Sequence, residues 1–81
     1  SPCYLSSTFK QITGMSYKHY VVQMSINKAR ELLANTNITI NKIAKQIGYK
    51  SPQYFSNIFK KETGLLPTEY RNMYQDKSIL N

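Results

Sequence analysis

Residues 39–63 read TINKIAKQIGYKSPQYFSNIFKKET, and this stretch decides the fold. Its first part carries apolar residues at the i, i+3, i+4, i+7 spacing of one helix face: Ile40, Ile43, Ala44 and Ile47. Thr39 precedes them as an N-cap, and Gly48 follows them as a helix stop. The pattern predicts a short helix over 40–47, a turn, and a second helix over 52–63. This order of elements is a helix-turn-helix.

The second of these helices has a copy fifty residues earlier in the chain. Residues 1–20 align with residues 51–70 at nine identical positions, namely Ser, Pro, Tyr, Ser, Phe, Lys, Thr, Gly and Tyr. Each copy opens with Ser-Pro, a cap followed by a proline at the first helical position, and closes with Thr-Gly, a helix stop. The repeat therefore predicts two equivalent helices, over 2–13 and 52–63.

Two more helices complete the chain: a long one over 17–34, capped by Ser16, and a last one from Pro67 to about Gln75. The residues expected to face the core from these helices are Tyr20, Val21, Met24, Ala29, Leu32, Leu33, Tyr70, Met73 and Tyr74. Period-2 alternation is absent, so the predicted fold class is all-α: a homeodomain-like helix-turn-helix bundle of about five helices.

The repeat also predicts two lobes. Residues 1–34 hold a partial first helix-turn-helix lobe, with reading helix 2–13 and connecting helix 17–34, and residues 38–76 hold a complete second lobe. The connecting helix would span about 27 Å at 1.5 Å per residue. Half-sites on one face of duplex DNA lie about 34–36 Å apart, so a rigid connector of this length can hold two reading helices in successive major grooves.

Charge points to a polyanionic partner. Eleven basic residues against four acidic ones give a formal net charge of +7, and no acidic residue occurs from position 32 to position 61. Double-stranded DNA is the partner we expect of such a domain, and a solvated lysine-rich surface with no partner is the alternative.

The sequence offers little support for a disulfide, a metal or cofactor site, or a membrane segment. One cysteine, Cys3, and one histidine allow neither an internal disulfide nor a four-ligand zinc site, and no cofactor is expected. Because no apolar run approaches a membrane span and no signal peptide is recognisable, we expect a cytoplasmic protein with no membrane partner.

The reading face follows from 100° per helical residue. Within about 60° of Gln53 lie Ser56, Asn57 and Lys60, and roughly opposite lie Phe55, Ile58 and Phe59. In the first copy the polar side is Cys3, Ser6, Ser7 and Lys10, and the apolar side is Leu5, Phe9 and Ile12. Both helices thus turn an apolar face inward and a polar face outward.

The chemistry of these side chains suggests a role for each. The amides of Gln53 and Asn57 can bond adenine bidentately, whereas serine hydroxyls are less selective. The predicted base contacts are Gln53, Ser56, Asn57, Cys3, Ser6 and Ser7. The predicted phosphate contacts are Lys10, Lys42, Lys50, Ser51, Lys60 and Lys61. Solvation is the alternative for each lysine, and helix capping is compatible with a phosphate contact at Ser51.

Three motifs resemble the AraC/XylS family of transcriptional activators: IAxxxGYxSxxYFSxxFKKxxGxxPxxYR over 43–71, YLSxxFKxxTG over 4–14, and AxxLL over 29–33. The resemblance implies two helix-turn-helix lobes joined by a long helix, DNA binding upstream of promoters and contact with RNA polymerase. Carried to matching positions, it implies the same base contacts as the helical geometry.

The chain departs from the family pattern in three ways. The helices that should precede Ser1 are absent, which suggests a fragment of a longer regulator. We expect the apolar surface thereby left bare to drive self-association, with exchange of helices as one route. Leu66 stands where the family has a Thr or Ser cap, which weakens the start of the last helix. Because Cys3, Ser6 and Ser7 are short, the first lobe would specify little.

Two other functions fit the sequence less well. Catalysis by His19, Asp76 and a serine lacks any nucleophile elbow or glycine-rich phosphate loop. The second rival is a basic helical module that binds RNA, a membrane surface or an acidic protein. RNA modules usually display aromatic side chains for stacking, whereas Tyr20, Tyr70 and Tyr74 fall on stripes predicted to face inward.

Overall fold

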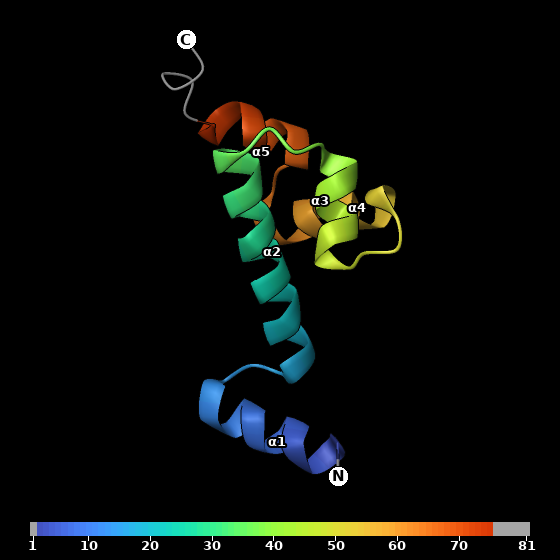
Figure 1. Ribbon diagram of the computed structural model, residues 1–81. Coiled ribbons are helices and arrows are strands. Elements are labelled where there is room, and N and C mark those ends of the chain that lie inside the picture. The colour runs from blue at the N-terminus through green and yellow to red at the C-terminus, as the bar shows by residue number, and fades with distance from the viewer. Residues whose placement is uncertain (1, 76–81) are drawn as a thin grey trace.

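The computed structural model describes the backbone of residues 2–75 and the side chains of residues 8–75. Regular structure in this part of the chain is entirely helical: α1 Pro2–Thr13, α2 Tyr17–Asn35, α3 Ile40–Ile47, α4 Pro52–Thr63 and α5 Pro67–Tyr74 (Figure 1). The predicted all-α class is confirmed. Four of the five helices begin and end as predicted or within one residue of it, and α5 begins at the predicted Pro67.

Local capping explains these bounds. The Ser16, Thr39 and Ser51 hydroxyls accept hydrogen bonds from the backbone N–H groups of His19, Lys42 and Tyr54, at 3.1, 3.2 and 3.0 Å. Gly48 ends α3 with a φ of +112°, a backbone conformation that residues with a side chain rarely adopt. The cap predicted at Ser1 lies outside the described residues.

Helix α5 starts without a side-chain cap at Leu66, as expected. The backbone N–H of Leu66 nevertheless donates to Glu69 Oε1 at 2.8 Å, so half of a capping box is present. This bond compensates in part for the missing hydroxyl, and the predicted weakness of this helix start is smaller than the leucine alone suggests.

The core lies where the C-terminal half of α2 meets α3, α4 and α5 (Figure 1). Its buried members are Ile26, Ala29, Leu32, Leu33, Ile43, Ala44, Phe55 and Phe59. Phe55 and Phe59 of α4 are fully buried, with ring centroids 5.8 Å apart. These two rings fix which side of α4 faces the protein.

The predicted inward stripe of α2 is wrong in its first half. Tyr20, Val21 and Met24 are 37%, 43% and 55% exposed. At 100° per residue, Tyr20 and Met24 lie about 140° and 180° around the helix from the fully buried Leu33. Val21 lies about 20° from Leu32, and it is exposed because α3, α4 and α5 pack on the C-terminal half of α2. Ile26, which the prediction omitted, is fully buried instead.

The prediction for α5 is also wrong at two positions. Tyr70 packs against the core and meets Phe59 edge-on at 5.4 Å, as predicted. Met73 and Tyr74 are 64% and 54% exposed. Met73 lies on the opposite side of α5 from Arg71. Tyr74 lies beyond the core, and its ring packs on that of Tyr70 with centroids 4.4 Å apart.

Arg71 ties α5 to the connection between α2 and α3. Its Nε donates to the Leu33 carbonyl at 3.2 Å, and its Nη2 donates to the carbonyls of Thr36 and Ile38 at 3.2 and 2.6 Å. Gln75 Nε2 adds a bond to the Thr36 carbonyl at 2.9 Å. Backbone groups that end α2 and enter α3 are thereby satisfied by side chains of α5.

The described part of the chain is elongated. It measures 51 × 24 × 19 Å, and its radius of gyration is 14.9 Å, against about 11 Å for a compact domain of this size. The elongation arises because α1 packs on the start of α2, at the end opposite to α3, α4 and α5 (Figure 1). The division into lobes at 1–34 and 38–76 stays a prediction.

Candidate nucleic-acid interface

The outer face of α4 carries the side chains predicted to read DNA. Gln53, Asn57 and Lys60 are exposed and Ser56 is partly exposed. Phe55 and Phe59, on the opposite side, are 0% exposed. The predicted orientation of this helix is confirmed, because the two aromatic anchors leave it no other rotation.

The two amides of this face are joined. Gln53 Nε2 donates to Asn57 Oδ1 at 3.0 Å, one helical turn apart. Each amide keeps a further donor hydrogen and an acceptor lone pair. The pair therefore keeps both donor and acceptor groups on the exposed side of α4, and the major-groove edge of adenine offers one acceptor and one donor to such an amide.

The turn between α3 and α4 packs against the start of this helix. Tyr49 packs its ring against Phe55 and Tyr54, with centroids 5.4 and 5.9 Å away. Burial raises the pKa of Tyr49, and a hydrogen bond with the Ser25 side chain on α2 opposes the rise. The Tyr49 ring thus packs the turn onto α4, and Lys50, the next residue, projects into solvent.

The lysines predicted to contact phosphate are all exposed. They are Lys10 on α1, Lys42 on α3, Lys50 in the turn, and Lys60 and Lys61 on α4. Within residues 8–75, the ion pair present is Lys28–Glu31 on α2, at 3.8 Å. None of the five predicted lysines is neutralised by a carboxylate there, so their charge is available to a polyanion. Ser51 is partly buried and acts as the cap of α4.

The first copy of the reading helix is described less fully. The side chains of Cys3, Ser6 and Ser7 lie outside the described ones, so the structure does not place them. Phe9 packs edge-on against Tyr17 and Tyr20 of α2, with centroids 5.5 and 5.0 Å away. Helices α1 and α4 begin on the same side of the molecule, at the right of Figure 1, as equivalent reading helices should.

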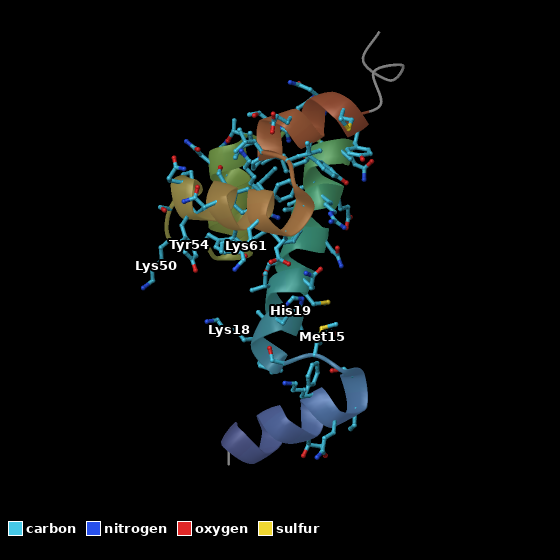
Figure 2. All side chains as sticks on the ribbon, turned by 180° about the vertical axis from the view of Figure 1, so that it is seen from behind. Met15, Lys18, His19, Lys50, Tyr54 and Lys61 are labelled. Carbon is cyan, nitrogen blue, oxygen red and sulfur yellow. The ribbon has the colours of Figure 1, made fainter. Side chains whose placement is uncertain are left out.

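Sequence reasoning missed a basic groove next to the reading face. It lies between the first turns of α2 and one flank of α4, and Lys18, His19, Tyr54 and Lys61 are among its lining residues (Figure 2). A signal was present in the sequence, since Lys18 lies on the same line along α2 as Val22 and Ala29, which pack in the core formed with α3, α4 and α5.

Other kinds of site are not apparent in the described part of the chain. Among residues 8–75, no group of three or more His, Cys, Asp or Glu side chains could hold a metal ion. His19 is exposed, with its Nε2 3.4 Å from Gln23 Nε2, and Asp76 lies outside the described residues. In the same region no helix is both long and apolar enough to cross a bilayer.

A helix-turn-helix whose second helix is anchored by aromatic rings and turns amides and lysines outward defines a class of protein, the helix-turn-helix DNA-binding domains. Comparison with known proteins specifies the family. Residues 1–73 match the family described as "Helix-turn-helix domain". The chain belongs to the AraC-type helix-turn-helix family, whose members bind DNA in transcription regulation.

Individual relatives agree with this assignment. The chain is 41% identical to the C-terminal domain of AraT, a response regulator from Geobacillus stearothermophilus, with a TM-score of 0.91 over 94% of this chain and 63% of that one. It is 40% identical to the HTH-type transcriptional regulator YfiF of Bacillus subtilis over 76 residues, 94% of this chain and 24% of that protein. It is 36% identical to the HTH-type transcriptional activator RhaR of Yersinia pseudotuberculosis, over 94% of this chain and 26% of that protein.

These two curated relatives are transcriptional regulators, and the chain spans about a quarter of their length. The region that they share with it is the helix-turn-helix region. The expected recognition, fold class and DNA-binding role are thereby confirmed.

Proposed function

We propose that the chain reads the sequence of double-stranded DNA through the outer face of α4, as the DNA-binding part of a transcription regulator. The single observation that carries this proposal is the division of α4 into two faces. Phe55 and Phe59 are wholly buried, while Gln53 and Asn57 are exposed and hydrogen-bonded to each other. A buried aromatic side and an exposed amide side are what a reading helix in the major groove needs.

Each exposed side chain has a distinct role in this proposal. Gln53, Ser56 and Asn57 contact base edges, where their amides and hydroxyl discriminate between bases. Lys42, Lys50, Lys60, Lys61 and Ser51 contact phosphates, which fixes the register of α4 without reading sequence. The exposure of all five predicted lysines and the absence of acidic residues from 32 to 61 support this assignment.

Helix α1 acts as a second, less selective reader. Its predicted base contacts are Cys3, Ser6 and Ser7, and its predicted phosphate contact is Lys10. The α2 connector, 19 residues long, spans about 28 Å at 1.5 Å per residue. That length and the common direction in which α1 and α4 begin support binding in two successive major grooves (Figure 1).

The roles can be separated by selecting binding sites from random duplex DNA with the wild-type chain and two variants. Asn57→Ala should relax the base preference at one position, because it removes one bidentate contact worth about 1–3 kcal/mol. Lys60→Ala should weaken all sites alike and flatten the dependence of affinity on salt. Lys28→Ala, which removes a lysine paired with Glu31 on α2, is the matched control for charge. Equal effects of Asn57→Ala and Lys60→Ala on every sequence would refute the assignment of roles.

The same assay addresses the alternative partners. Duplex RNA and anionic vesicles are offered at matched ionic strength. Tighter binding to either than to duplex DNA would favour the basic interaction module over the DNA reader. Preference for duplex DNA follows from a helix shaped for the B-form major groove, because the major groove of A-form RNA is too narrow to admit it.

The wider protein is also a matter of proposal. We infer that the chain works within a longer, cytoplasmic regulator, contacts RNA polymerase at promoters and carries out no catalysis. The curated relatives named as transcriptional regulators support the regulatory part of this inference. Self-association through apolar side chains of α1 and α2 is a further proposal, supported by the exposure of Ile12, Tyr17 and Met24 at 79%, 56% and 55%.

A further inference from the structure

A basic groove separates α4 from the first two turns of α2. It has a volume of about 360 Å³, and its lining residues are Ser16, Lys18, His19 and Val22 of α2, and Tyr54, Ile58, Lys61 and Glu62 of α4. We call it the α2–α4 groove. In Figure 2 the Lys18, Tyr54 and Lys61 side chains lie around the space between the reading helix α4 above and α1 below.

The groove exists because α2 continues beyond the bundle that it supports. Along one line of α2, Val22, Ala29 and Leu33 face α3, α4 and α5, and Ala29 and Leu33 are fully buried. Lys18 occupies the next position on that line, one turn before Val22. If α4 extended as far as this position, we would expect an apolar residue there. Lys18 places an exposed ammonium group there instead.

The charge of the groove favours an anionic occupant. Lys18 and Lys61 are both exposed, and neither forms an ion pair within the described residues. The one carboxylate on the wall, Glu62, accepts a hydrogen bond from Gln23 Nε2 on α2. Gln23 also lies against the His19 ring, so this side of the groove is held by an amide between the two helices.

The position of the groove relative to α4 identifies the anion. Taking Gln53 as zero, Lys61 and Tyr54 lie about 80° and 100° around α4, on the flank that faces α1. Base contacts and groove lining therefore occupy adjacent strips of one helix. A major groove that receives the face of Gln53 and Asn57 brings its bordering phosphodiester strand onto that flank.

We propose that the α2–α4 groove binds the phosphodiester strand that runs between the two major grooves entered by α4 and α1. Lys18 and Lys61 contact its phosphates, which makes Lys18 a DNA contact contributed by the connecting helix itself. This inference rests on the proposed function. The inference adds that the connecting helix α2 contacts DNA, as well as setting the distance between the reading helices α1 and α4.

The test measures the affinity of the chain for a labelled, mixed-sequence duplex of about 25 base pairs, somewhat over two turns, across a salt series. Phosphate contacts are independent of sequence, so no operator has to be known. Lys18→Ala is compared with Lys28→Ala, which removes the same charge from another side of the same helix. Lys18→Arg keeps the charge, and Lys60→Ala reports on the reading helix.

We expect Lys18→Ala to reduce the slope of log affinity against log salt by about 0.9, the value for one lost phosphate contact. Over a fourfold rise in salt, the affinity of this variant then falls by roughly 3- to 4-fold less than that of the wild type. Lys18→Arg should restore the slope, and Lys28→Ala should leave it unchanged. On a site selected from random duplex DNA by the wild-type chain, an ethylation-interference experiment should place the phosphates that matter to the wild type but not to Lys18→Ala between the two half-sites.

The outcomes separate the two proposals. If Lys60→Ala flattens the slope while Lys18→Ala behaves like Lys28→Ala, the groove is not a phosphate site and α4 still reads DNA. If Lys60→Ala has no effect, or the wild-type chain binds no duplex, the proposed function fails and this inference fails with it.

Discussion

Arg71 illustrates how a single guanidinium can organise backbone from two other helices. Its donors reach three carbonyl oxygens, those of Leu33, Thr36 and Ile38, across the end of α2 and the approach to α3. A planar fork with several fixed N–H groups suits this arrangement, whereas an ammonium group on a flexible chain does not. The family motif contains this arginine, but its partners are backbone groups and leave no trace in the sequence.

We predict that Arg71→Ala lowers the free energy of unfolding by about 2–4 kcal/mol, because three partly buried carbonyls lose charge-assisted donors. Arg71→Lys should recover less than half of this loss, since one ammonium group cannot span the same acceptors. Urea denaturation followed by circular dichroism measures both. Lys60→Ala, on the exposed face of α4, is the control for loss of a cation. A stability of Arg71→Ala within experimental error of this control would contradict the role given to Arg71.

Tyr49 couples the helix-turn-helix turn to pH. Burial raises its pKa above the ordinary 10.0, against the opposing effect of the Ser25 hydrogen bond, with smaller contributions from Tyr54 and Glu62. A raised pKa in the folded state means that the neutral phenol contributes stability below pH 10, and that this stability is lost as the pH rises through the raised value.

We therefore expect the free energy of unfolding to fall less steeply above pH 10 in Tyr49→Phe than in the wild type. The substitution keeps the ring against Phe55 but removes the ionisable group. In an absorbance titration of the tyrosines, the component that ionises at the highest pH should be missing from this variant. Tyr54→Phe, at an exposed neighbouring ring, serves as the control. Identical alkaline limbs for Tyr49→Phe and the wild type would show that burial of this phenol has no consequence.

At the scale of elements, the turn between α3 and α4 depends on Gly48. Its φ of +112° is one that a residue with a Cβ adopts only under strain, yet an added Cβ would meet nothing within 4 Å. Any destabilisation by Gly48→Ala is therefore a backbone effect alone. We predict a loss of about 1–2 kcal/mol in the free energy of unfolding, the cost of a left-handed conformation for an L-residue.

Asn41→Ala, at an exposed site within α3, is the control for this experiment. It should change the stability by less than about 0.5 kcal/mol. Because α4 is anchored by Phe55 and Phe59 independently of the turn, Gly48→Ala should retain DNA binding at temperatures where it is folded. A fully folded Gly48→Ala that no longer binds DNA would show instead that the turn sets the geometry of the reader.

The helices themselves were predictable because their ends are encoded locally. Each of the described caps, Ser16, Thr39 and Ser51, makes its bond within three residues along the chain. The rotation of α4 was predictable as well, since its apolar and polar residues separate into two clear faces. Which side of α2 is buried was not, because Tyr20, Val21 and Met24 are as apolar as the residues that do face the core.

What decides the burial of α2 is the position of its partners. Helices α3, α4 and α5 surround only its C-terminal half, and a helical pattern does not indicate where along a helix packing stops. For the same reason, the sequence alone does not predict the α2–α4 groove. The alignment of Lys18 with Val22 and Ala29 becomes informative only when the end of the bundle is known.

At the scale of the whole molecule, the elongated shape leaves α1 and the first half of α2 with little cover. Ile12, Tyr17, Val21 and Met24 are each at least 43% exposed, although all are apolar or aromatic. Phe9 covers part of Tyr17 and Tyr20, with ring centroids 5.5 and 5.0 Å away. The basic, polar surface of α4 and the apolar surface around α1 thus lie at different ends of one connector.

We predict that the chain self-associates through these exposed apolar side chains, because burying them removes apolar surface from water at about 25 cal/mol per Å². Sedimentation velocity over a concentration series should show a rising mean mass. The double variant Ile12→Lys with Met24→Lys should remain monomeric. The control Asn41→Lys with Asn72→Lys, at exposed positions on α3 and α5, should associate as the wild type does. A wild-type chain that stays monomeric at the highest concentrations would show that its apolar end is tolerated in water. Association that persists in the Ile12→Lys, Met24→Lys variant would place the contact elsewhere.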